Sequence, residues 1–187
     1  MTPPIAEPIT VRRVRTPDLT AADLAQLLDL FHACWPAGEF SIDDTAHAMG
    51  GLHWLAETRG RIVGHASVVP RLLEAHGVPM TTGYVEAVAT HPDCRRRGIA
   101  SRLLALVNEH IAETFELGAL STDLHSVYAR VGWERWHGPT YVRTDGGPLR
   151  TEDEDEDDGI MILRTPRTTP LAGTEALSCE WRAGDAW

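Results

Sequence analysis

The spacing of apolar and polar residues along the chain predicts three helices and eight strands. A strand at 9–14 is followed by a helix at 20–35, for which Thr20 is a favourable N-cap. Apolar residues of this helix recur at intervals of three and four and are expected on one buried face: Leu24, Leu27, Leu28 and Phe31. Further helices are expected at 97–112 and at 124–131, the latter ended by Gly132. Short apolar or alternating runs predict the remaining strands: 53–58, 62–69, 80–90, 117–121, 133–142, 160–163 and 176–181.

The order of these elements predicts a mixed α/β (α+β) fold with one central β-sheet flanked by helices. The length favours a single domain over residues 1–187. Residues 1–9 are rich in proline and are expected to form a loose N-terminus. Seven consecutive acidic residues, 152–158, are expected to form a loop inside the fold because apolar strands follow them.

Composition excludes several classes of protein. Hydrophobic residues make up 43% of the chain and charged residues 24%, which is ordinary for a globular protein and excludes a disordered, collagen-like or coiled-coil chain. The longest apolar stretches are too short for a membrane span, and the N-terminus does not resemble a signal peptide. Three widely spaced cysteines fit neither a disulfide framework nor a zinc site. We therefore expect a soluble, cytoplasmic protein.

The charge balance restricts the partners. The chain has 17 basic and 27 acidic residues, for a net charge of −10, and seven of the acids lie in the run at 152–158. Such a chain lacks the basic face that phosphate contacts require, so a nucleic-acid partner is not expected. A cationic partner is the natural complement. Nine histidines include no H-x-x-x-H or H-E-x-x-H pair, so no metal site is expected.

The junction between the strand at 80–90 and the following helix carries the clearest chemical signal. Three consecutive arginines at 95–97 precede Gly98 and Ala100, whose small size lets main-chain N–H groups approach a ligand closely. The N-terminus of a helix favours an anion, so this segment predicts a pyrophosphate site. The alternative is a solvated turn, but arginine at that end of a helix opposes the helix dipole unless an anion is bound.

These residues resemble a known family. Arg95-x-x-Gly98-x-Ala100 after an apolar strand is similar to the acetyl-coenzyme A signature of the GNAT N-acetyltransferases, and Tyr128-x-x-x-Gly132-Trp133 is similar to a second element of that family. Further blocks, among them 83–89, 117–121, 136–140 and the terminal Trp181-Arg-Ala-Gly-Asp-Ala-Trp187, resemble aminoglycoside 2′-N-acetyltransferases. The resemblance implies a GNAT acyltransferase fold over the whole chain and inactivation of aminoglycoside antibiotics. It also implies direct transfer in a ternary complex and, because such enzymes are often dimers, a homodimer.

The resemblance implies roles for individual residues. Glu86 is the candidate base for the substrate ammonium, and Tyr128 is the candidate acid for the leaving thiolate. The alternatives are a Glu86 that faces outward and a Tyr128 that is only a half-buried helix aromatic. Acetyl-CoA is the implied co-substrate, held by the following residues: Val88, Ala89, Thr90, Arg95, Arg96, Arg97, Gly98, Ile99 and Ala100.

An aminoglycoside is polycationic, and the resemblance places mainly acidic groups around it. The implied substrate-binding residues are Glu39, Glu86, Ala87, Ser121, Glu156, Asp157, Asp185 and Trp187, the last through packing and its carboxylate. Glu39 stands where a shorter Asp is expected, and the acidic run is longer than expected, which leaves the register of Glu156 and Asp157 open. The other tryptophans, Trp35, Trp54, Trp133 and Trp136, are expected in the core.

Two alternatives stay open. The protein could be a GNAT acetyltransferase for another amine, such as a polyamine, a cell-wall intermediate or a peptide N-terminus. It could also be a non-catalytic module that binds coenzyme A, although the presence of both Glu86 and Tyr128 argues against that hypothesis.

Overall fold

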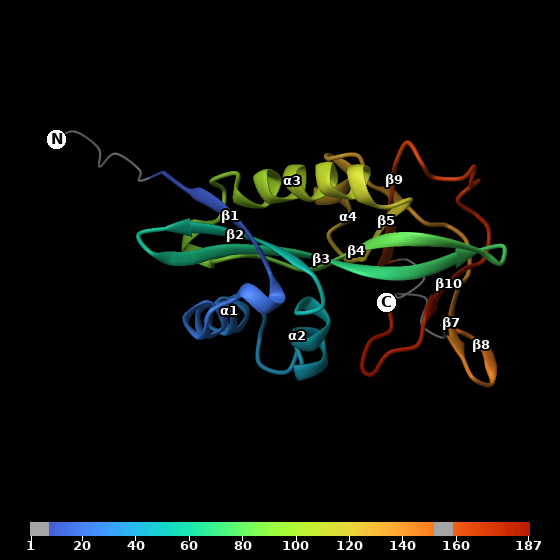
Figure 1. Ribbon diagram of the computed structural model, residues 1–187, viewed down its shortest axis with the longest axis horizontal. Coiled ribbons are helices and arrows are strands. Elements are labelled where there is room, and N and C mark those ends of the chain that lie inside the picture. The colour runs from blue at the N-terminus through green and yellow to red at the C-terminus, as the bar shows by residue number, and fades with distance from the viewer. Residues whose placement is uncertain (1–7, 152–158) are drawn as a thin grey trace.

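The computed structural model describes residues 8–151 and 159–187. Within them, ten strands form one mixed sheet in the order β6-β9-β5-β4-β3-β10-β7-β8, with β2 also paired to β3 and β1 to β2 (Figure 1). The strands are β1 (Thr10–Arg15), β2 (Leu52–Thr58), β3 (Arg61–Ala75), β4 (Val78–Thr90), β5 (Leu117–Ser121), β6 (Glu134–Arg135), β7 (Thr140–Thr144), β8 (Gly147–Arg150), β9 (Ile160–Arg164) and β10 (Leu177–Glu180). The helices are α1 (Ala21–Cys34), α2 (Ile42–Ala48), α3 (Ile99–Thr114) and α4 (His125–Ala129).

Helices α1 and α3 cover opposite faces of the sheet (Figure 1). Side chains of α3 such as Leu103 and Val107 are fully buried in one core cluster, and Leu27 and Phe31 of α1 are buried in another. The start of α1 is fixed by a capping box in which Thr20 and Asp23 satisfy each other's main-chain N–H groups. No helix of the described residues is long and apolar enough to cross a membrane.

The expected buried face of the first helix was partly wrong. Leu24 and Leu28 are 40% and 43% exposed, whereas Leu30, which the pattern did not single out, is buried. The buried stripe therefore runs through Leu27, Leu30 and Phe31, because α1 covers only the part of the sheet formed by β3 and β4.

Strands β3 and β4 form a long antiparallel hairpin that is the spine of the sheet. One edge of β3 pairs with β2 along Arg61–Val68 and with β10 at Glu74 and Ala75, so both halves of the sheet share this strand. Strand β4 pairs in parallel with β5 only at Thr82, Gly83 and Tyr84. Beyond Tyr84 the two strands separate, and their separation opens a cleft between them.

Several boundaries differ from those expected. The strand expected at 133–142 is two strands: β6 pairs with β9, and β7 pairs with β10 elsewhere in the sheet. The chain passes between them at Gly138, where an added Cβ would lie 1.8 Å from the carbonyl oxygen of Glu175, so only glycine fits. Helix α3 begins at Ile99 rather than at residue 97. Helix α2 and strand β8 were not expected.

Candidate active site

The cleft between β4 and β5 has a volume of about 590 Å³. It is lined by residues from four parts of the chain that are far apart in sequence: the segment from α1 to α2, strand β4, the segment from β5 to α4, and the segment after β10. Eight of the residues proposed from the sequence lie together in its wall: Glu39, Glu86, Ala87, Val88, Ser121, Tyr128, Asp185 and Trp187.

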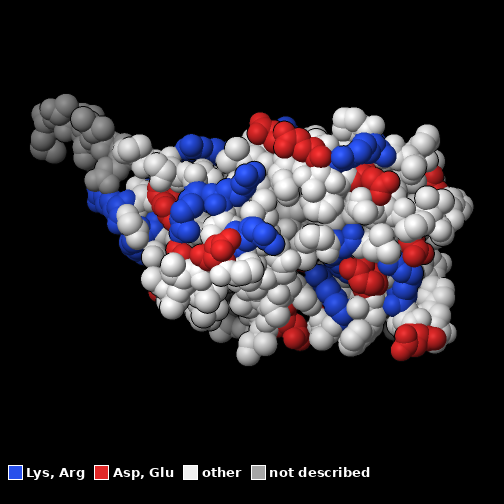
Figure 2. Space-filling view, in the orientation of Figure 1, with Lys and Arg blue, Asp and Glu red and all other residues white. Residues whose placement is uncertain are grey.

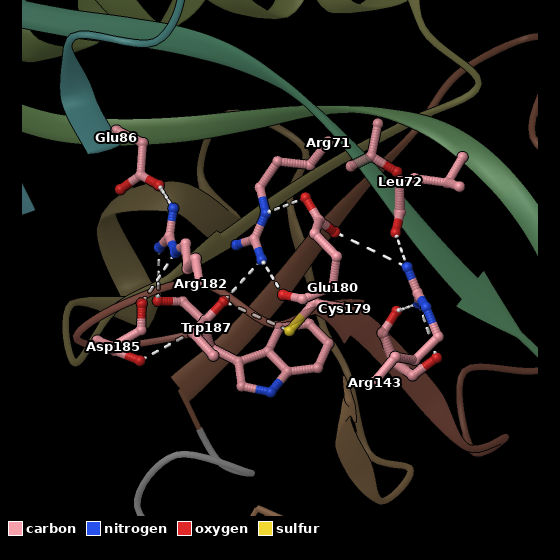
Figure 3. Close-up of polar contacts among 12 residues, drawn as sticks. Arg71, Leu72, Glu86, Arg143, Cys179, Glu180, Arg182, Asp185 and Trp187 are labelled. Carbon is pink, nitrogen blue, oxygen red and sulfur yellow. Dashed lines mark hydrogen bonds and ion pairs between the residues drawn. The ribbon is translucent and has the colours of Figure 1, made fainter. Parts of the chain in front are cut away.

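Glu86 lies on β4 with its carboxylate in the cleft, mostly buried. Its Oε1 accepts a hydrogen bond of 2.6 Å from Nη1 of Arg182 (Figure 3). Burial raises the pKa of Glu86 above its usual value, and the positive charge of Arg182 opposes that rise. A carboxylate with a raised pKa is a better proton acceptor, which suits a general base.

A β-bulge follows Glu86 directly. The register shifts so that Glu86 pairs with Ser67 and Ala89 with His65, and Ala87 adopts a left-handed conformation with φ of 48°. The carbonyl oxygen of Ala87 accepts a hydrogen bond of 2.7 Å from Nδ1 of His65. Val88 lines the cleft, and its register has no pair with β3 at the bulge or with β5, whose pairing with β4 ends at Tyr84.

A buried hydrogen-bond chain holds this bulge in place. His65 Nδ1 donates to Ala87, so in the neutral ring Nε2 accepts from Nδ1 of His53 at 2.9 Å. Nε2 of His53 in turn lies 2.8 Å from the hydroxyl of Thr16. Burial lowers the pKa of His65 to about 3 and that of His53 to about 4, which keeps both rings neutral and the direction of the chain fixed.

Tyr128 lies on α4, on the β5 side of the cleft, and is 8% exposed. Its ring packs edge-to-face on Trp133, with 6.2 Å between the ring centroids. Burial raises the pKa of Tyr128 to about 12, and a hydrogen bond with the Thr122 side chain lowers it by less. The phenol therefore keeps its proton at neutral pH and can donate it.

The segment between β4 and α3 is exposed and has an unusual backbone. Arg96 and Gly98 adopt left-handed conformations with φ of 62° and 75°, and Gly98 is the N-cap of α3 without a side-chain cap. The first N–H groups of α3 are thus open to an anion, beside Arg95 and Arg97, which are exposed. The side chains of Ile99 and Ala89 are buried, so these two residues can offer a ligand only main-chain groups.

The hydroxyl of Thr90, at the end of β4, is buried and has no hydrogen-bond partner in the described part of the chain. A buried hydroxyl of this kind favours a ligand or water beside it. Together with the open helix N-terminus, it fits a phosphate-containing molecule with an extended polar arm that runs along β4 toward the cleft.

The rim of the cleft is acidic. Glu39 is exposed at its edge, and Asp185 accepts a hydrogen bond of 2.9 Å from the main-chain N–H of Trp187. Trp187 is 3% exposed, and its indole N–H donates to Thr151 at 3.1 Å. Its side chain is therefore mainly a packed core residue, with little surface left for contact with a ligand. Ser121 is exposed beside Gly159. The proposed substrate residues Glu156 and Asp157 lie outside the described residues.

Ten residues that line the cleft were not proposed as site residues from the sequence. Trp35 was expected in the core; it is half-buried against the core cluster under α1, but it also lines the cleft and stacks on Phe40 with 4.4 Å between the ring centroids. Arg182 was quoted only as part of the terminal block. The others are Phe40, Asp44, Tyr84, Val85, Leu120, Thr122, Asp123 and Leu124. The two aromatic residues at positions 35 and 40, which flank Pro36 and Gly38, were a sequence signal that could have predicted this part of the site. No local pattern could have predicted the ion pair of Arg182, because its partner is 96 residues away.

Comparison with known proteins identifies the family. Residues 15–136 match the model of the acetyltransferase (GNAT) domain. The chain belongs to the GNAT acetyltransferase family. It is also 36% identical over 152 residues to the aminoglycoside 2′-N-acetyltransferase of Mycolicibacterium fortuitum, a match that covers 80% of this chain and 78% of that protein.

Solved structures of GNAT proteins share the fold. The GNAT N-acetyltransferase YhbS of Escherichia coli, solved with CoA, superposes with a TM-score of 0.67 at 16% identity, over 96% of this chain and 93% of that one. A GNAT acetyltransferase of Brucella melitensis, solved with acetyl-CoA, gives a TM-score of 0.59 at 17% identity, over 95% and 98% of the two chains. The GNAT fold expected from the sequence is thereby confirmed.

Proposed function

We propose that this GNAT protein transfers the acetyl group of acetyl-CoA to the 2′-amine of aminoglycosides. The observation that carries the proposal is the cleft itself, in which a buried carboxylate on β4 and a phenol on α4 line one cavity with an acidic rim. The similarity to the aminoglycoside 2′-N-acetyltransferase of M. fortuitum supports the choice of substrate.

Glu86 removes the proton from the substrate ammonium, directly or through water. Its position deep in the cleft and its raised pKa favour this role over that of an outward-facing carboxylate. The neutral amine then attacks the thioester carbonyl, and we assign the N–H of Val88, which follows the bulge and has no register partner in β3, as the donor to the oxygen on which negative charge develops. As the C–S bond breaks, Tyr128 donates its proton to the departing sulfur, and the second proton of the amine nitrogen passes to the resulting phenolate, directly or through water.

Acetyl-CoA supplies the acetyl group as a thioester. The first turn of α3 and the arginines at 95–97 would hold its diphosphate, and the edge of β4 at 88–90 would hold its extended arm. None of the three cysteines, which are all unpaired, lines the cleft, and burial raises the pKa of Cys34 and of Cys179, the latter to about 11. These features favour direct transfer rather than an acyl-cysteine step.

The acidic residues at the rim suit a polycation. Glu39, Asp44, Asp123 and Asp185 lie around the opening, and the four carboxylates can each accept hydrogen bonds from ammonium groups. On the face shown in Figure 2, basic and acidic side chains are interspersed rather than gathered into a broad basic patch. In this proposal the substrate is held by local carboxylates and by packing of its saturated rings on the indole of Trp35.

The test is release of free thiol from acetyl-CoA with two matched drugs. Kanamycin B carries an amine at the 2′ position, and kanamycin A carries a hydroxyl there and is otherwise the same molecule. Turnover with kanamycin B and none with kanamycin A is expected. Equal turnover would overturn the 2′ assignment, and turnover of neither drug, with polyamines or peptides accepted instead, would overturn the substrate class.

A further inference from the structure

Arg182 joins Glu86 to the end of the chain (Figure 3). Its three nitrogens donate in three directions: Nη1 to Glu86, Nε to the carbonyl oxygen of Asp185 at 2.8 Å, and Nη2 to the main-chain oxygen of Trp187 at 3.3 Å. The side chains of Arg182 and Glu86 are only 16% and 15% exposed. One guanidinium thus contacts both the proposed base and the turn formed by residues 181–187, which we call the terminal turn.

A second arginine holds the same turn from β3. The side chain of Arg71 is 2% exposed, and its Nη2 donates to the carbonyl oxygens of Ala186 at 2.7 Å and Glu180 at 3.3 Å. The ring of Tyr84 contacts both arginines, with the guanidinium carbons of Arg71 and Arg182 at 4.5 Å and 5.5 Å from its centroid. Arg71 makes no hydrogen bond with Glu86 among the described contacts, so Arg182 alone connects the turn to the base directly.

We propose that Arg182 is a positioning residue that keeps Glu86 ionised and aimed into the cleft, and that couples it to the terminal turn that binds the substrate. This inference rests on the proposed function of Glu86 as the base. A carboxylate buried among apolar groups loses its hydration, and an arginine in contact restores part of that stabilisation by charge and hydrogen bonding. Since Oε1 is held by Arg182, Oε2 remains to take the proton from the substrate.

The alternative is that Arg182 only holds the turn in place. The charged and titratable groups that face Glu86 are Arg182 from the turn, Arg71 from β3, His47 from α2 and Tyr84 of β4 itself. Arg182 donates a hydrogen bond to Glu86 and has the strongest effect of these groups on its pKa. A purely structural clamp would change stability without changing the titration of Glu86. A positioning residue would change the titration.

Arg143 on β7 provides a matched control. Like Arg182, it donates to main-chain oxygens, here those of Ser178 and Leu72, and it forms ion pairs with Glu74 and Glu180. It also ties β10, the strand before the terminal turn, to its neighbours. It does not contact Glu86, so Arg143→Gln removes comparable structural bonds and leaves the base untouched.

The experiment is a titration of the Glu86 side-chain carboxyl by its ¹³C resonance, assigned by comparison with Glu86→Gln. In Arg182→Gln the midpoint should move to higher pH by about one unit or more, the size of effect that an opposite charge in contact has on a carboxyl. The acidic limb of kcat/KM for an accepted aminoglycoside should move with it. In Arg182→Lys, which keeps the charge, and in Arg143→Gln, the Glu86 midpoint and the acidic limb of kcat/KM should stay near their wild-type positions.

An unchanged Glu86 titration in Arg182→Gln, or an equal shift in Arg143→Gln, would overturn the proposal. If Arg182→Gln does not fold, Arg182→Lys decides: a Glu86 midpoint at or above the wild-type position together with a raised KM for the drug supports the coupling, and a wild-type midpoint with a wild-type KM overturns it. The titration needs no substrate. A wild-type protein that acetylates no aminoglycoside would therefore overturn the proposed function while the titration still decides the role of Arg182.

Discussion

Glu86 is the residue whose replacement tests the chemistry most directly. In Glu86→Gln the side chain keeps its size and can still contact Arg182, but it can no longer take up a proton. We expect kcat/KM for an aminoglycoside to fall about 10²- to 10⁴-fold, the range that general bases contribute, and most at low pH, where more of the amine is protonated. Steady-state thiol release from pH 6 to 9 measures this.

Glu74→Gln is the matched control for that substitution. Glu74 also lies in the β3–β4 hairpin and pairs with an arginine, Arg143, but it does not line the cleft. Its replacement should leave kcat/KM within about twofold of wild type. A similar loss in both variants would show that Glu86 matters for the hairpin rather than for proton transfer.

Replacement of Tyr128 tests its role in catalysis separately from the binding of CoA. In Tyr128→Phe the ring still packs on Trp133, but the proton for the departing sulfur is lost. We expect kcat to fall about 10²-fold or more while the Kd for CoA, measured by calorimetry, changes little. Since the pKa of Tyr128 is raised to about 12, no loss of activity should be traceable to its ionisation below pH 10. The control Tyr141→Phe changes a tyrosine of β7 outside the cleft, and an equal loss there would contradict the role.

At the scale of elements, the turn into α3 makes a prediction about the co-substrate. Gly98 has φ of 75°, and an added Cβ would point into open space, where the diphosphate is proposed to lie. Gly98→Ala should therefore weaken CoA binding about tenfold or more, with a strain cost of about 1 kcal/mol to folding.

Gly77→Ala isolates the effect of strain in that experiment. Gly77, in the β3–β4 hairpin turn, has φ of 73° and also has open space around its would-be Cβ, but it lies at the opposite end of β4 from the turn into α3. It should lose a similar amount of stability by thermal melting and keep wild-type CoA affinity. Equal losses of CoA affinity in the two variants would argue against a phosphate site at Gly98.

The elements with strong periodic patterns could be predicted from the sequence. The strand at 117–121 has the expected bounds, and α1, α3 and β4 lie within a few residues of theirs, because apolar spacing, capping and a single register determine them. Helix α2 was missed because it has only seven residues, four of them polar, and buries only Ala48. The division of the strand at 133–142 depends on a main-chain approach at Gly138 that only the folded structure reveals.

The candidate site, too, could be predicted from the sequence only in part. Glu86 and Tyr128 were found because motifs and the family resemblance point to them. The Arg182 ion pair, the bulge at Ala87 and the His53–His65 chain arise from contacts across 96, 22 and 12 positions of sequence. No local spacing encodes such contacts, since they form only when β2, β3, β4 and the terminal turn come together.

At the scale of the whole molecule, one stability property follows from the buried histidines. His53 on β2 and His65 on β3 are fully buried, and His65 packs edge-to-face on Phe31 of α1 with 5.1 Å between the ring centroids. Their pKa values in the folded protein, about 4 and about 3, lie well below the value near 6.5 of an unfolded chain. Between pH 6.5 and 4 the unfolded state therefore binds more protons than the folded state.

The free energy of unfolding should consequently fall as the pH falls from 6.5 to 4. Each unit of pH costs up to about 1.4 kcal/mol per histidine, so the pair together can remove several kcal/mol between pH 6.5 and 4. Urea unfolding at pH 7.5, 6.5, 5.5 and 4.5 measures how steeply the free energy of unfolding depends on pH.

His65→Gln, whose amide can still donate to Ala87 and accept from His53, should be less stable at pH 7.5 but lose less stability on acidification. His32→Gln, at an exposed position of α1, should keep the wild-type slope, and an equal slope in His65→Gln would mean that carboxylates rather than the buried histidines set the acid sensitivity.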